Sequence, residues 1–272
     1  MKIEDTINLT FGVIMLFLTI LGSAKIKGFY IHLLVEILAI VIILIASRSK
    51  IEIIRNWYSL ILVPTYFMNL RGLVEAINPV CYDRFLFEID KHIFFGRNPF
   101  EIVDKLQSPI LSDVLQICYT LYFFVPVIAG ISLYNRDRKA FRLGLTTILV
   151  TFYLSYLGYF LVPAVGPRFV LNNSNPKKQE VLASKIKEIL DKLEPTKFDC
   201  FPSGHTAVSL ACLYIVRKHK KTFLLLLPIT LGIILATIYH KYHWMTDVIA
   251  GVTLFMISVP ISNILFRLGK NE

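Results

Sequence analysis

The amino-acid sequence predicts an all-α protein built as a polytopic bundle of membrane helices. Hydrophobic residues make up 55% of the 272 residues, and charged residues make up only 18%. The mean hydropathy of +0.62 is too high for a soluble domain of this length. Several apolar runs also approach the length of about 20 residues that a helix needs to cross a bilayer. These observations exclude an ordinary soluble protein.

The apolar runs divide the chain into eight expected spans. The first two form an N-terminal transmembrane hairpin over residues 1–50, and the other six form a core over residues 51–272. The first run is followed by another run and not by a small-residue cleavage site, so we expect it to remain as a helix. The sixth span is short and needs its terminal basic residues to reach the interface. The spans are 7–24, 29–46, 57–74, 110–134, 141–162, 203–216, 222–240 and 245–266.

The basic residues predict how these spans are oriented. The basic residues of the short loops near 48–55, 136–142 and 217–221, and those after the last span, all fall on one side of the bundle, with Lys25 and Lys27 in the first outer loop as a minor exception. Cytoplasmic loops carry an excess of Lys and Arg. We therefore expect both termini in the cytoplasm. The net charge of +10 is spread over short loops and forms no continuous basic surface, so no nucleic-acid partner is expected. The loop residues are Arg48, Lys50, Arg55, Arg136, Arg138, Lys139, Arg142, Arg217, Lys218, Lys220, Lys221, Arg267 and Lys270.

Two longer polar segments, residues 75–109 and 163–202, fall on the outer side. Apolar and charged residues alternate in both as they do in helices at a membrane surface. In the second segment the apolar residues between 182 and 193 recur at helical spacing. We predict amphipathic helices that pack at the interface, with a moving lid as the less favoured alternative. Asp90, in the first segment, is expected to be a surface charge.

The four cysteines have no paired C-x-x-C spacing, so a zinc or redox motif built on thiolates is not expected. Cys118 and Cys212 fall in apolar spans, where they are expected to be small core residues. Cys81 and Cys200 fall in the two outer segments. Two free thiols are the default there, and a disulfide is the alternative.

Two histidine clusters flank the hairpin made by the sixth and seventh spans. Pro202-Ser203-Gly204-His205 precedes the sixth span, and the stretch from His240 to Asp247 leads into the last one. Both clusters therefore lie on the outer side, where they can converge on one substrate group. Ser203 is expected to cap the helix, and Gly204 lets an anion approach its backbone amides. This pattern suggests phosphate chemistry at a membrane face.

His243 and Asp247 are four residues apart, so on a helix they share one face. The carboxylate can then accept a hydrogen bond from the imidazole, which leaves the other ring nitrogen available as a nucleophile. An acid in an apolar span is costly unless it is paired, which favours a functional role for Asp247. Arg168 follows the fifth span on the same side, where it either clamps phosphate oxygens or anchors to headgroups. For His240 and Lys241 two roles are equally favoured: they donate hydrogen bonds to the phosphate, or they lie in the headgroup layer.

These residues resemble the motifs of the type 2 phosphatidic acid phosphatase superfamily. Pro202 to His205 match the family's second motif in full, and His243 and Asp247 match the end of its third. The resemblance covers the last six spans and implies a phosphatase-like catalytic core. It implies that His243 attacks phosphorus and becomes a phosphohistidine, that Asp247 orients it, and that His205 protonates the leaving oxygen. Phosphate-binding roles would fall to Arg168, Ser203 and Gly204, and no metal or other cofactor would be needed.

The chain departs from the family pattern at its usual cations. The family's lysine of the first motif falls at Leu161, and its Ser-Arg pair falls at Ala236 and Thr237. A Gly-Pro-Arg sequence at 166–168 without the third-motif arginine looks like the inositol phosphorylceramide synthase branch. The phosphate would then lack positive charge unless His240, Lys241 or an outer-segment residue supplies it.

The function expected first is an integral-membrane phosphatase or phosphotransferase acting on a lipid or prenyl phosphate ester, with its site on the outer side. The close alternative is a transferase that moves a phosphoinositol-type headgroup to a lipid hydroxyl. A proton-coupled transporter is the alternative from another class. Two further readings are an acyl-transfer triad of Ser203, His243 and Asp247, and a zinc site of His205, His243 and Asp247. No pattern in the sequence indicates an oligomeric state.

Overall fold

The computed structural model describes residues 1–171, 186 and 196–269, and this part of the chain contains helices and no strand. The all-α prediction is confirmed. Six helical segments are long and apolar enough to cross a membrane, which agrees with the predicted polytopic bundle. The helix expected between residues 182 and 193 lies outside the described residues, apart from Ile186. The six segments are α1 (Ile3–Leu21), α2 (Phe29–Ala46), the run from α8 (Pro109–Leu121) through η1 (Tyr122–Phe124) to α9 (Val125–Tyr134), α10 (Arg138–Leu161), α14 (Lys220–Tyr239) and α15 (Met245–Leu268).

Two of the eight expected spans are shorter than a full crossing. The sixth is α13 (Gly204–Ile215), which has 12 residues and is short as expected. The third is not one helix, because the chain forms α3 (Glu52–Trp57), α4 (Ser59–Asn69) and α5 (Leu73–Ile77) in its place. Gly72 has a positive φ of 71°, which glycine adopts without steric cost, and it separates α4 from α5.

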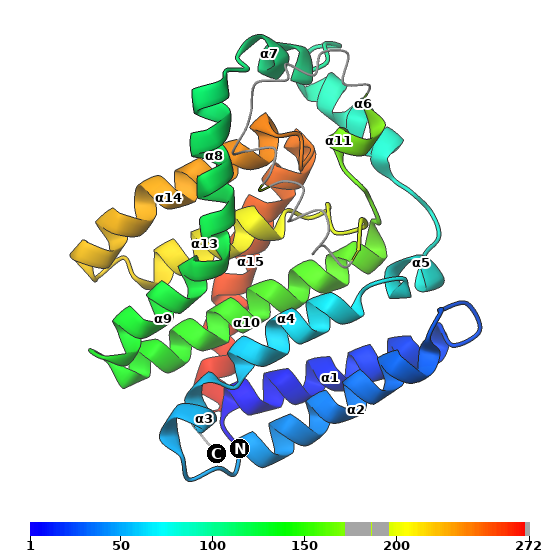
Figure 1. The fold of residues 1–272 in the computed structure, drawn as a ribbon. Coiled ribbons are helices and arrows are strands. Elements are labelled where there is room, and N and C mark those ends of the chain that lie inside the picture. Colours follow the sequence, from blue (N-terminus) through cyan, green and yellow to red (C-terminus); the bar gives the residue numbers. More distant parts are fainter. Residues whose placement is uncertain (172–185, 187–195, 270–272) are drawn as a thin grey trace.

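The N-terminal hairpin of α1 and α2 packs on the core along α4 and α10 (Figure 1). Phe11 and Met15 of α1 are buried in one apolar cluster with Tyr66 of α4 and Tyr153 of α10. Asn8 adds a buried polar contact, since it accepts a hydrogen bond from the Tyr153 hydroxyl at 2.5 Å. The hairpin is therefore continuous with the core that it covers.

The helices α10 and α15 each have 24 residues, about 36 Å of helix, and they pack against each other. At one end of the pair the two chain ends meet, because Gly269 lies against Ile3 (Figure 1). Arg142 donates to both carboxylate oxygens of Glu4 at the same end, at 3.1 and 3.2 Å. The end of α10 and the start of α15 lie at the other end of the bundle. Both histidine clusters are there, opposite the termini.

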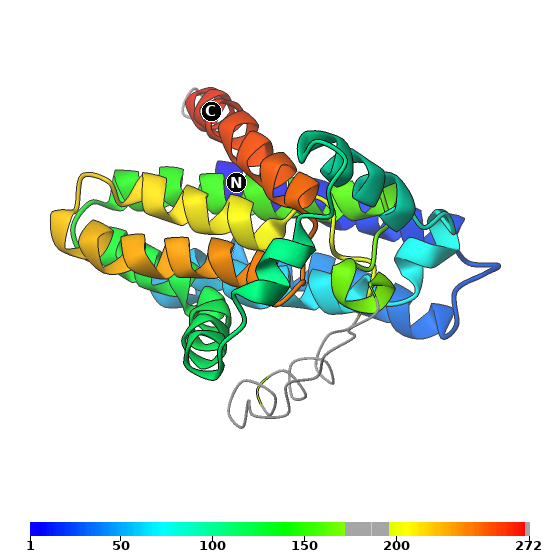
Figure 2. The same cartoon turned by 90° about the horizontal axis from the view of Figure 1, so that it is seen from above.

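The outer segment between residues 75 and 109 forms α6 (Asp83–Ile93) and α7 (Phe100–Lys105). Both helices lie beside the start of α15, over the end of the bundle that carries the histidines (Figure 2). A third short helix, α11 (Pro167–Val170), follows α10 at this end. The described part of the second outer segment then leads into α13. Together these pieces position the candidate site.

Candidate active site

His243 lies in the loop between α14 and α15, and not on a helix. The expectation that it shares a helical face with Asp247 is wrong, because α15 begins at Met245 with Trp244 as its N-cap. Asp247 stands in the first turn, where its Oδ2 accepts a hydrogen bond from the Trp244 amide at 2.7 Å. This turn still brings Oδ2 to 3.5 Å from Nδ1 of His243. His243 and Asp247 are therefore brought together because the loop before α15 runs directly into the first turn of this helix.

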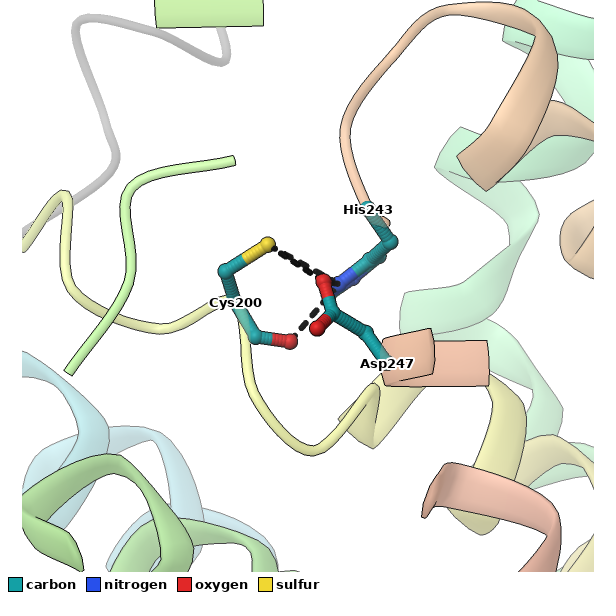
Figure 3. Close-up of side chains that lie close together, drawn as sticks. All are labelled: Cys200, His243 and Asp247. Atoms are coloured by element: carbon teal, nitrogen blue, oxygen red, sulfur yellow. Dashed lines mark hydrogen bonds and ion pairs between the residues drawn. The ribbon is translucent and has the colours of Figure 1, made fainter. Parts of the chain in front are cut away.

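The orientation of the His243 imidazole is set by Cys200, just before α13. The Nδ1 atom lies 2.8 Å from the Cys200 carbonyl oxygen, closer than either Asp247 Oδ2 or the Cys200 sulfur (Figure 3). A carbonyl oxygen only accepts hydrogen bonds, so the neutral imidazole carries its proton on Nδ1. The lone pair is therefore on Nε2, which faces Nδ1 of His205 at 3.5 Å. This backbone contact was not predictable from the residue types.

His205 lies in the first turn of α13, between two tyrosine rings. Its ring centroid is 4.4 Å from that of Tyr119 and 4.2 Å from that of Tyr122. The expected cap is confirmed, since the Ser203 hydroxyl accepts from the Thr206 amide at 3.3 Å. The Ser203 amide in turn donates to the Asp247 carbonyl at 3.0 Å, which joins the starts of α13 and α15. The two histidines are thus held by two linked helix ends.

Helix packing requires a glycine at position 204, in addition to any requirement from a bound ligand. A Cβ atom there would lie 2.8 Å from the Tyr159 hydroxyl and 3.4 Å from Ser155 Oγ, both on α10. The absence of a side chain therefore allows the first turn of α13 to lie against α10. The helix end that carries His205 is fixed in this way.

Arg168 stands on α11, and its amide donates to the Lys241 carbonyl at 2.9 Å. Its guanidinium lies over the ring of Tyr242, 4.8 Å from the centroid, in the same loop as His243. Asp199 is an acidic residue beside Arg168 that was not predicted from the sequence. Burial raises the pKa of Asp199, whereas the Arg168 charge and then the His243 imidazole act to lower it. Its position three residues before the Pro-Ser-Gly-His motif was the one available signal.

A family model described as PAP2 superfamily matches residues 84–261, which is more than half of the chain and includes both histidine clusters and Arg168. The chain belongs to the PAP2 superfamily. Membership supports a phosphoric ester hydrolase or phosphotransferase of the lipid phosphatase type, and the six apolar helices agree with a multi-pass membrane protein. No curated protein and no solved structure matches the chain.

Two carboxylates of α6 hold the loops of this PAP2 site. Asp83 accepts from the amides of Val165 and Gly166 and from the Trp244 indole, each at 2.8 Å. Asp90 accepts from the amides of Met245 and Thr246 at 2.8 Å and from the Thr246 hydroxyl at 2.5 Å. The exposed fraction is 2% for Asp83 and 0% for Asp90. The expectation that Asp90 is a surface charge is wrong, because α6 places both aspartates against the start of α15 and the loop before Arg168.

The other predicted cations of the PAP2 site lie further toward the outer helices. Lys241 pairs with Asp104 of α7, with 2.6 Å between Nζ and Oδ1, so its ammonium is directed at that helix. His240 caps the end of α14, and its ring centroid lies 5.5 Å from that of Tyr242. Lys197 lies over the ring of Phe169, with Nζ 5.1 Å from the ring centroid. Phe169 is the residue that follows Arg168. Lys197 is thus a cation of the outer segment that lies close to the helix of Arg168.

The positions that carry Lys and Arg in the family motifs hold uncharged residues in this chain, so they supply no positive charge to the site. Leu161 is 72% exposed at the end of α10, whereas Ala236 and Thr237 are buried in α14. The backbone carbonyl of Thr237 instead accepts from the amides of Tyr242 and His243, at 2.8 and 3.0 Å, and shapes the loop. Positive charge at the described site therefore comes from Arg168 and from residues outside the family motifs.

The default expectation that Cys81 and Cys200 are unpaired is confirmed, and the zinc set raised as an alternative is not brought together. All four cysteines are free, so Cys81 and Cys200 form no disulfide. His205 faces Nε2 of His243, whereas Asp247 faces Nδ1 on the other side of the ring. One zinc ion does not reach all three residues in this arrangement. The sulfur of Cys200 is the atom that joins His243 and Asp247.

Proposed function

We propose that this PAP2 protein cleaves a lipid or prenyl phosphate ester through a phosphohistidine at His243. The observation that supports this best is the pairing of the two histidines, with Nε2 of His243 turned toward His205 at 3.5 Å and Nδ1 held by a carbonyl. Nε2 attacks phosphorus, the bond from phosphorus to the ester oxygen breaks, and His205 gives its proton to that oxygen. Asp247 stabilises the positive charge that develops on the imidazole.

The second half of the reaction returns the enzyme to its starting state. Water attacks the phosphoryl group on His243, the bond between nitrogen and phosphorus breaks, and His205 takes the proton of the water. Free phosphate leaves. The reaction needs positive charge around the equatorial oxygens, which Arg168 supplies together with Ser203 and the first amides of α13. Lys197, and His240 at the end of α14, are further donors beside this group.

A lipid substrate fits the location of the site. The histidines lie at the end of a bundle whose helices are apolar enough to cross a membrane, so an ester held in the bilayer reaches them by its headgroup. The basic short loops between α2 and α3, between α9 and α10 and between α13 and α14 lie away from the histidines, and by the positive-inside rule this supports a cytoplasmic location of the termini. On this proposal the site faces the periplasm, the cell exterior or a lumen.

Transfer to a lipid hydroxyl is the second candidate, as in the inositol phosphorylceramide synthase-like branch. It is favoured by apolar side chains that α6, α7 and their connection leave exposed near the site. Phe85 is 61% exposed, Phe95 is 97% exposed and Ile102 is 55% exposed. Such a surface suits the chain of a second lipid whose hydroxyl replaces water in the second step. A phosphoinositol-type headgroup would then move to that lipid.

Purified protein incubated with phosphatidic acid, with prenyl pyrophosphate, or with phosphatidylinositol and ceramide distinguishes the two candidates. Released phosphate supports hydrolysis, and a new phospholipid supports transfer. His243→Ala is expected to abolish turnover, and His205→Ala to slow it most for esters with poor leaving groups, because those depend most on the acid. His219→Ala, at the other end of α14, is the matched control.

An unchanged rate in His243→Ala would refute the mechanism. Two outcomes would favour other functions. Labelling of Ser203 by a fluorophosphonate probe would favour acyl transfer, and proton flux in liposomes without turnover would favour the transporter.

A further inference from the structure

We propose that Cys200, His243 and Asp247 form a binding site for a thiophilic divalent cation, Zn²⁺ or Cd²⁺, and that the bound ion inhibits the enzyme. The three side chains come from the loop before α13, the loop before α15 and the first turn of α15, and they point toward one another (Figure 3). The effect on turnover rests on the proposed function. Binding of the ion does not, because it needs only these three ligands.

The distances between the donor atoms match one face of a tetrahedral zinc site. The Cys200 sulfur lies 2.8 Å from Asp247 Oδ2 and 3.5 Å from His243 Nδ1, and Nδ1 lies 3.5 Å from Oδ2. Tetrahedral sites with bonds of about 2.0–2.3 Å separate their ligands by about 3.3–3.8 Å. Two of the three edges already fall in that range. The third distance, between the Cys200 sulfur and Asp247 Oδ2, has to increase by about half an ångström when an ion replaces the hydrogen between these two atoms.

The set of ligands also fits this class of ion. Thiolate, imidazole and carboxylate are the groups that bind Zn²⁺ in proteins, and the thiolate selects against Mg²⁺ and Ca²⁺. Two negative charges, from Cys200 and Asp247, balance the charge of the ion. This set differs from the zinc site suggested by sequence, since Cys200 takes the place of His205.

A second observation points to a ligand at the same place. Asp247 Oδ1 is buried and has no hydrogen-bond partner within the described part of the chain. A buried carboxylate oxygen without a partner is unfavourable, and a cation beside it would remove that cost. The atom can therefore supply the fourth ligand position through a bidentate carboxylate, or it can bind a water on the ion.

Binding requires one proton to leave and one to move. The ion replaces the proton on the Cys200 sulfur, which is released to solvent, and the proton on His243 Nδ1 moves to Nε2, so that the ring binds the ion as a neutral imidazole. The hydrogen bond from Nδ1 to the Cys200 carbonyl is lost in the exchange. Asp199, next to Cys200 in sequence, is partly exposed, so the loop that carries the sulfur reaches the surface of the molecule.

The bound ion blocks chemistry at the opposite ring nitrogen. With the ion on Nδ1, the single proton of the neutral imidazole is on Nε2, so this atom has no lone pair with which to attack phosphorus. The ion also occupies Asp247, which then no longer stabilises positive charge on a phosphohistidine. Turnover should stop while the substrate-binding residues, such as Arg168, stay in place.

The binding test uses the full chain, purified free of metal, with Co²⁺ as a spectroscopic substitute for Zn²⁺. Wild-type protein is expected to give a thiolate-to-cobalt charge-transfer band at one equivalent, which Zn²⁺ displaces. Cys200→Ser keeps a donor to Asp247 and is expected to lose the band and to weaken Zn²⁺ binding by about 100-fold or more, since even indirect changes cost 10–100-fold. Cys212→Ala, which removes another buried thiol, is the matched control and should keep the band.

The inhibition test compares each variant with its own metal-free rate. Zn²⁺ is expected to inhibit wild type and Cys212→Ala, with recovery after chelation, and to inhibit Cys200→Ser only at about 100-fold higher concentration. Absence of the cobalt band in wild type, or its persistence in Cys200→Ser, would overturn the site. A band with undiminished turnover at saturating Zn²⁺ would overturn the inhibition. A band in a protein that turns over no phosphate ester would contradict the proposed function and support the metal site.

Discussion

Replacing Asp90 by alanine tests whether α6 fixes the start of α15. The carboxylate is fully buried and accepts from two backbone amides and one hydroxyl, all within the first turn of that helix or next to it. Alanine leaves both amides without their acceptor. A buried donor that loses its partner costs about 1–3 kcal/mol, and loss of a helix cap alone costs about 0.5–2 kcal/mol. We expect the free energy of unfolding to fall by about 3 kcal/mol.

Reversible unfolding in mixed micelles measures this change through Trp244, which is buried beside the cap, with circular dichroism as a second probe. Glu88→Gln is the control on the same helix. Its side chain is 56% exposed and pairs with Lys91, so its removal should cost less than about 0.5 kcal/mol. Equal stabilities of Asp90→Ala and Glu88→Gln would refute the conclusion that this carboxylate holds the helix.

Two further predictions concern the loops around the histidines. Gly166 has a φ of 89°, and a Cβ there would lie 2.6 Å from the Tyr242 carbonyl oxygen, so Gly166→Ala should cost at least about 2 kcal/mol and lower turnover. Gly96→Ala, at φ 82° in open space, should cost only about 1 kcal/mol with turnover intact, and an equal loss in both would show that strain alone matters. For Asp199, burial raises the folded-state pKa, so the folded protein holds this proton to higher pH than the unfolded chain does. Wild type should therefore lose stability relative to Asp199→Asn as pH rises from about 4 toward 7, seen as a widening gap in thermal midpoints, and a gap that widens in favour of wild type would contradict this.

The convergence of the two histidines was predictable because it follows from topology. The sixth and seventh spans form a hairpin, so groups at its two outer ends must lie at the same end of the bundle. His205 and His243 meet there at 3.5 Å. The contacts that orient them were not predictable, because Cys200 acts through a backbone carbonyl. A carbonyl is present at every residue and leaves no trace in the amino-acid types.

The error at Asp247 had a readable cause. Four-residue spacing was taken as one helical face, although an acid three residues after the first cap position is also the usual signature of a helix start. Asp90 was misread for a related reason. A charged residue in an amphipathic segment is usually solvated, and only the long-range contact with Thr246 shows that it faces inward. Both errors concern polar residues that bind the backbone of a distant segment.

The geometry is also compatible with the proposed binding of a phosphate beside His243, although carboxylates lie next to this residue. Asp90 and Asp247 both bind amides at the start of α15, where the helix dipole stabilises negative charge. Asp247 lies on the Nδ1 side of His243, whereas Nε2 faces His205 at the start of α13. The first amides of α15 are thus occupied by protein carboxylates. In the first turn of α13 the Thr206 amide donates to Ser203, and the amides of Gly204 and His205 are the ones suited to an anion. Because burial raises the pKa of Asp199, that residue opposes a phosphate beside Arg168 less than an ordinary aspartate would. The ring of His243 therefore separates an anionic side, which stabilises the charged imidazole, from a side suited to the proposed phosphate.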